Sequence, residues 1–115
     1  MEWKAATLSE VGDIVKADLA KCDPEQMATF RQFSVEPYYA PIVRYGEIGQ
    51  VVVVARKSDE VMYWEDVEEG FNISPVGQDG VVLEHWCNQD ELGWALNSWI
   101  EGREGDAKWL PAEPL

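Results

Sequence analysis

The most regular pattern of apolar and polar positions lies in the middle of the chain, between residues 50 and 64. Four consecutive valines at 51–54 precede a polar turn at 56–60, and a second apolar run at 61–64 follows. Short runs of β-branched and aromatic residues on either side of turn residues predict a β-hairpin. Because each run is apolar at every position, both faces of this hairpin should be covered, which places it in the middle of a sheet.

An apolar period of three to four residues predicts two helices near the N-terminus. The first, over about 8–21, carries a stripe formed by Leu8, Val11, Val15, Leu19 and Cys22. Thr7 and Glu10 have the spacing of a capping box at its start. The second helix, over about 24–33, begins with Asp23 as cap and Pro24 at the first position, so the two helices form a hairpin with a very short turn.

The remaining pattern predicts outer strands and a third helix. The expected strands cover 42–45, 71–74 and 81–85, and the first of these should be an outer strand of the sheet. The third helix should begin near Asn88 as its cap and end at Gly102. Its buried stripe would consist of Leu92, Ala95, Leu96, Trp99 and Ile100.

Together these elements predict an α+β fold with a mostly antiparallel sheet of four to five strands. An N-terminal helical hairpin and a C-terminal helix pack on the sheet, and the connections within the sheet are too short for helical crossovers. Residues 1–102 form the single domain, and 103–115 form a tail that Trp109 could pin to it. The side chains expected to be buried are Leu19, Val51, Val53, Val61, Tyr63, Leu83, Leu92 and Leu96.

Charge is the strongest compositional signal, since 22 acidic residues against nine basic ones give a net charge of −13. Such a chain repels nucleic acid and anionic lipid, and it attracts a basic partner at long range. The alternative is that the acidity serves only solubility. No run of about 18 apolar residues predicts a membrane span, and the start of the chain lacks the features of a signal peptide. A cytoplasmic protein, monomeric or weakly dimeric and without a cofactor, is therefore expected.

The first candidate site is an acidic run next to aromatic residues. Its seven residues are Tyr63, Trp64, Glu65, Asp66, Glu68, Glu69 and Phe71. The run could be a solvated acidic face, or a contact surface on which the aromatic side chains anchor a basic partner. Its spacing does not match a calcium-binding loop. In both interpretations the carboxylates are exposed, so replacing all four by amides should leave stability nearly unchanged.

The second candidate site is the corner formed by His85 and Cys87, just before the predicted third helix. A thiol near a histidine and a helix N-terminus could act as a nucleophile. As a zinc site the corner has two of four ligands, with Cys22 the sole further soft ligand. The remaining interpretation is a structural corner, with both cysteines reduced. Motifs for phosphate loops, hydrolases and metalloproteases are missing from the sequence.

The function that these patterns favour is that of a small acidic, non-enzymatic binding protein. In size, acidity and aromatic content the chain resembles small bacterial proteins and the acidic immunity proteins that neutralise toxins. The resemblance implies an inhibitor or immunity-type protein for a basic partner. The alternatives are a small enzyme or ligand-binding protein that uses His85 and Cys87, and a structural domain.

Overall fold

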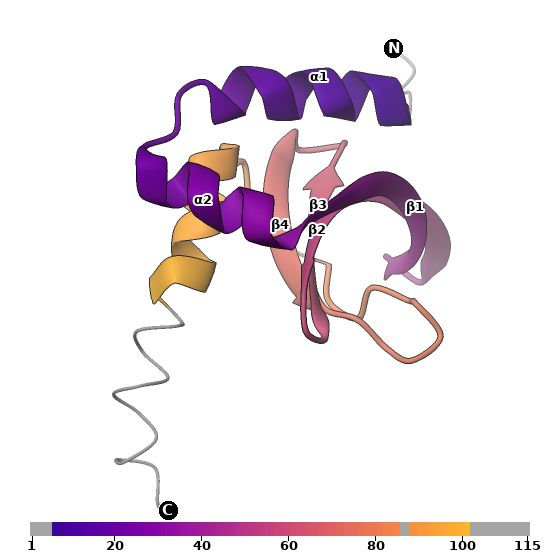
Figure 1. Cartoon of the computed structure of the whole chain (residues 1–115). Coiled ribbons are helices and arrows are strands. Elements are labelled where there is room, and N and C mark those ends of the chain that lie inside the picture. The colour runs from indigo at the N-terminus through magenta and orange to yellow at the C-terminus, as the bar shows by residue number, and fades with distance from the viewer. Residues whose placement is uncertain (1–5, 86–87, 102–115) are drawn as a thin grey trace, which may run out of the picture.

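Two N-terminal helices lead into a four-stranded sheet, and a third helix follows the sheet (Figure 1). The computed structural model of the chain describes residues 6–85 and 88–101. Its elements are α1 (Leu8–Leu19), α2 (Pro24–Phe33), β1 (Ser34–Arg44), β2 (Glu47–Lys57), β3 (Glu60–Glu65), β4 (Gly70–Pro75) and a C-terminal helix over 92–101. The strands pair in the order β1-β2-β3-β4, and every pair is antiparallel. The predicted α+β fold is confirmed.

The first strand is much longer than the sequence predicted. β1 has 11 residues and includes the segment 36–41, which was expected to be an extended connector. Its two prolines are tolerated because β1 is an outer strand of the sheet. Pro37 lies in an irregularity of the β1–β2 ladder, between Ser34 and Tyr38. The strand therefore avoids the ladder hydrogen bond that Pro37 could not donate.

The beginnings of the first two helices agree with the sequence patterns. Thr7 and Glu10 form the predicted capping box of α1, and Asp23 caps α2 with the help of Gln26. These local hydrogen bonds satisfy amides that have no partner within a helix.

The predicted cap of the third helix is wrong. The helix begins at 92 rather than near Asn88, and the Leu92 amide donates to Asp18 Oδ2 in α1, at 3.0 Å. Asn88 instead exchanges two hydrogen bonds of 3.1 Å with the side chain of Asn72. The cap of this helix is thus supplied by a residue far away in the sequence.

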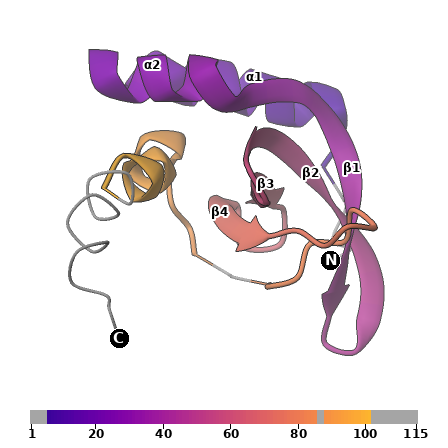
Figure 2. The same cartoon turned by 60° about the horizontal axis from the view of Figure 1, so that its bottom comes forward.

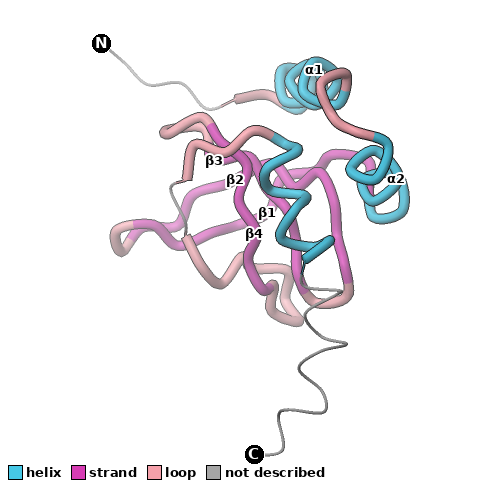
Figure 3. The backbone as a smooth tube through the Cα atoms, turned by 90° about the vertical axis from the view of Figure 1, so that its left-hand side faces the viewer, coloured by secondary structure: helices cyan, strands magenta, loops and turns pink. Residues whose placement is uncertain are grey.

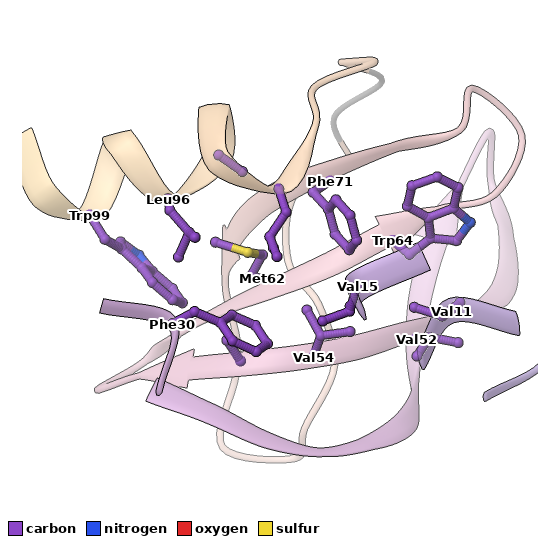
Figure 4. Close-up of a cluster of buried hydrophobic side chains, with 13 residues drawn as sticks. Val11, Val15, Phe30, Val52, Val54, Met62, Trp64, Phe71, Leu96 and Trp99 are labelled. Atoms are coloured by element: carbon purple, nitrogen blue, oxygen red, sulfur yellow. The ribbon is translucent and has the colours of Figure 1, made fainter. Parts of the chain in front are cut away.

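One face of the sheet packs against the helices (Figures 2 and 4). Val54 and Met62 from the sheet meet Phe30, Leu96 and Trp99 from the helices in this cluster. A bulge in β2 between Val53 and Ala55 lets Val54 and Ala55 both join it. Leu19, predicted to be buried, is partly buried at the edge of the cluster.

The other face of the sheet has a core of its own, because the sheet curls round on itself. The residues of this second cluster are Ala40, Ile42, Val51, Val53, Val61, Tyr63, Val76 and Val82. The valines of β2 therefore contribute to both clusters in alternation. The prediction that both faces of the β2–β3 hairpin are covered is confirmed.

The predicted strand at 81–85 is reduced to a short bridging segment. Val82 forms isolated bridges to Val76 and to Ile42 of β1, and its amide donates to the Pro41 carbonyl at 2.8 Å. This links the end of β4 to β1 and closes the curl of the sheet. Leu83, expected to be buried, is 59% exposed. Because successive side chains of an extended segment alternate, burial of Val82 turns Leu83 outward.

Two further expectations concern membrane spans and the C-terminal tail. No helix among the described residues is long and apolar enough to cross a membrane. The predicted tail at 103–115, with Trp109, lies outside the described residues.

Candidate functional site

The three aromatic residues of the predicted partner surface lie in the interior. Tyr63 and Phe71 are fully buried, and Trp64 is 9% exposed. Both faces of β3 are covered and both of its edges are paired, so its aromatic side chains fill the two cores. The burial of Tyr63 is as predicted. As aromatic anchors, however, the three side chains have almost no surface to offer a partner.

Glu65 is also buried, contrary to the expected solvated face. Its side chain is 0% exposed, and Arg44 Nη1 donates to both carboxylate oxygens, Oε1 and Oε2, at 3.2 Å each. His85 Nε2 lies 2.7 Å from Oε2, and the Val67 amide donates to Oε1 at 2.8 Å. Strand alternation explains the position, since Glu65 shares a sheet face with Tyr63. A buried carboxylate is tolerated only with such partners.

Arg44 connects this buried carboxylate to the end of the β1–β2 hairpin. Its Nη1 also lies 3.5 Å from Asp66 Oδ1, and its Nη2 donates to the Gln50 carbonyl at 3.2 Å. A Cβ added at Gly49 would come within 2.9 Å of Arg44 Nη2, so a glycine there leaves room for the guanidinium. Sequence analysis missed Arg44, although it is the one basic residue of the apolar run at 42–45.

Asp66 is held on its other side by the start of α1. The Ala6 amide donates to Asp66 Oδ2 at 3.2 Å, and the Asp66 side chain is only 7% exposed. Of the four acidic residues, Glu69 is the exposed one, and Glu68 is half-buried. We call the network of Arg44, Glu65, Asp66 and His85 the buried ion network. Because its side chains are largely buried, it holds the ends of β1 and β3 together.

His85 belongs to this network, which changes the second candidate site. Its ring meets Tyr45 edge-on, with 5.5 Å between ring centroids. Cys87 lies outside the described residues, so its pairing with His85 stays a prediction. No group of three His, Cys, Asp or Glu side chains in 6–85 and 88–101 could hold a metal ion. Cys22 is a free thiol, and its pKa is raised by partial burial and by nearby Asp18.

Exposed apolar side chains gather at the end of the β1–β2 hairpin. Val43 is 54% exposed, Tyr45 88%, Ile48 81% and Val67, in the loop after β3, 52%. Val43 and Ile48 lie opposite each other in the ladder. Tyr45, Ile48 and Val67 line one groove of about 570 Å³ together with Glu47. We call Val43, Tyr45, Glu47, Ile48 and Val67 the hairpin-tip surface.

The hairpin tip projects from the rest of the fold, on the side away from α1 and α2 (Figures 2 and 3). β1 and β2 continue past the end of β3, because Val52 pairs with Trp64 and β3 ends one residue later. The helices that cover Val52 do not cover Ile48, which lies on the same face of β2. Sequence analysis placed 42–45 in a strand and did not identify this surface.

Comparison of the chain with protein-family models, with characterised proteins and with solved structures gives no match.

Proposed function

We propose that this protein is a non-enzymatic binding module, of the inhibitor or immunity type, that binds a basic partner protein through the hairpin-tip surface. The observation that carries the proposal is the group of four large apolar side chains, each more than half exposed, at one projecting end of the fold. Adjacent exposed apolar side chains rimmed by polar residues are typical of protein–protein contact sites. The exposed aromatic ring of Tyr45 is of the type that dominates binding energy at such sites.

The charge of the surroundings supports a basic partner. Glu47 lies in the groove with Tyr45, and Glu68 and Glu69 follow Val67 in the adjoining loop. Among the described residues that line the groove, the cationic one is Arg44, and its guanidinium is engaged by Glu65 and Asp66. Because the chain has a net charge of −13, long-range attraction accelerates its encounter with a basic protein, and the apolar contacts then stabilise the complex.

The buried ion network supports the proposal by fixing the shape of this surface. His85 touches both Glu65 and the ring of Tyr45, and Arg44 joins the hairpin to the loop that carries Val67. A contact surface that is already ordered loses less conformational entropy when it binds. Glu68 and Glu69 of the sequence-based prediction follow Val67 in the chain and so adjoin the proposed surface, whose exposed side chains replace the buried aromatic anchors.

The test compares capture of basic proteins by surface variants. The tagged protein, its Tyr45→Ser/Ile48→Ser variant and a Trp94→Ser control are exposed to lysate of the source cells at low and high salt. Trp94 is 68% exposed on the C-terminal helix and lines a different groove. We expect the wild type and the control to capture basic proteins and the double variant to capture none. The amount captured should fall at high salt. Equal capture by the double variant contradicts the proposal.

A further inference from the structure

The β1–β2 hairpin leaves part of β2 with a strand neighbour on one side. Residues 47–50 pair with β1 through Arg44↔Glu47, Val43↔Ile48, Ile42↔Gly49 and Pro41↔Gln50. On the other side β3 ends at Glu65, one residue beyond the Val52↔Trp64 pair. Within 6–85 and 88–101 no strand pairs with 47–50 on that side. An open strand edge of this kind is a template for another strand.

The turn geometry shows which backbone groups point to the open side. Tyr45 and Gly46 have φ values of 51° and 80°, which is the pattern of a two-residue hairpin turn. The flanking pair Arg44↔Glu47 is therefore hydrogen-bonded, and the next pair, Val43↔Ile48, is not. It follows that the N–H and C=O of Ile48 and of Gln50 point away from β1.

An observed contact agrees with this assignment. The Gln50 carbonyl accepts a hydrogen bond from Arg44 Nη2 at 3.2 Å, as expected if it points away from the β1 backbone. Pro41, which has no N–H, lies opposite Gln50 at a position where the ladder needs no donor. The groups left for an added strand are the N–H and C=O of Ile48 and the N–H of Gln50.

We propose that this edge of β2 binds an extended, basic segment of the partner as an additional strand alongside 47–50. The inference rests on the proposed function and specifies how the partner is recognised. Apolar side chains of the segment would contact Ile48 and Val67, and its cations would face Glu47. A second copy of this chain is the less favourable occupant, because pairing two such edges would bring two chains of net charge −13 together.

The probe is a capped peptide of alternating lysine and valine, Lys-Val-Lys-Val-Lys-Val-Lys. Its matched control has every backbone amide N-methylated, so it keeps side chains and charge and loses the strand donors. Binding is followed by NMR at the Ile48 and Gln50 amides of the full chain. Strand addition predicts binding of the first peptide and at least about tenfold weaker binding of the second, since several backbone hydrogen bonds are lost.

A pair of variants tests the same edge from the protein side. Ile48→Pro removes the outward N–H and leaves every β1–β2 ladder bond in place, whereas Ile48→Val keeps that N–H. We expect the peptide to bind about tenfold or more weakly to Ile48→Pro and nearly unchanged to Ile48→Val. Should Ile48→Pro fail to fold, the comparison of the unmethylated and N-methylated peptides on the wild type still tests strand addition.

Three results would overturn strand addition. They are equal binding of both peptides, no binding of either peptide to the wild type, and a concentration-dependent dimer that excludes the peptide. The failure of this inference can be told from failure of the proposed function. If Ile48→Pro still captures the basic proteins that Tyr45→Ser/Ile48→Ser loses, only strand addition is wrong. If capture does not depend on the hairpin-tip side chains, the proposed function is wrong.

Discussion

At the scale of single residues, the acidic run after β3 combines two different kinds of carboxylate. Glu65 is buried and paired with Arg44, whereas Glu69 faces solvent. The burial of Glu65 could have been predicted from the sequence, because strand alternation places Glu65 on the same face of the sheet as the buried Tyr63. The sequence does not reveal the partner of Glu65, since Arg44 lies 21 positions away and its guanidinium reaches Glu65 past Gly49 of the intervening strand β2.

Replacing Glu65 by glutamine should therefore destabilise the fold. The change removes the carboxylate that lies 3.2 Å from Arg44 Nη1, and it disturbs the contact with His85. We expect the free energy of unfolding to fall by about 3–5 kcal/mol, the usual cost of removing one member of a buried ion pair. Urea denaturation of the wild type and of Glu65→Gln measures it.

The matched control is Glu69→Gln in the same loop. Because Glu69 is exposed, its replacement should change the free energy of unfolding by no more than about 0.5 kcal/mol. If both variants unfold at the wild-type midpoint, the burial of Glu65 is wrong, and the expectation of a fully solvated acidic face is restored.

At the scale of elements, local patterns predicted the helices better than the strands. The first two helices were predicted because their caps lie within three residues of the amides that they satisfy. The start of the C-terminal helix was missed because its cap, Asp18, is 74 positions from Leu92. No local pattern can reveal such a contact.

The remote cap is open to a direct test. Asp18→Ala leaves the Leu92 amide without its acceptor, so the free energy of unfolding should fall by about 0.5–2 kcal/mol. Asp13→Ala, on the exposed side of α1, is the control and should have little effect. Thermal or urea denaturation that shows the same loss for both would assign the effect to α1 itself rather than to the cap.

Two leucines test the packing of neighbouring elements. Leu96, on the C-terminal helix, is fully buried, and Leu83, in the bridging segment, is 59% exposed. Leu96→Ala should cost about 2–5 kcal/mol of unfolding free energy because it leaves a cavity. Leu83→Ala should cost much less, although the sequence alone predicted both leucines to be buried. Similar denaturation midpoints for the two variants would show that the helix does not dock on the sheet as described.

At the scale of the whole molecule, the sequence was sufficient for the α+β fold and the central place of β2 and β3. It was insufficient for the curl of the sheet and for the overhang of the β1–β2 hairpin. Both depend on how far each strand finds a partner, as with the segment 36–41, which became part of β1. The proposed surface at Tyr45 and Ile48 follows from that overhang, so local patterns could not identify it.

The central claim is that the hairpin-tip surface contacts a basic partner, and site-specific crosslinking tests it most directly. A photo-reactive phenylalanine analogue replaces Tyr45, which is 88% exposed, in cells that make the protein naturally, and Asp13 on α1 is the control position. The proposal predicts that position 45 forms crosslinks to a basic protein and that position 13 does not. Irradiation of a lysate at high salt should give a lower yield than irradiation at low salt. Crosslinks from position 13 to the same protein with none from position 45, or none from either, would contradict it.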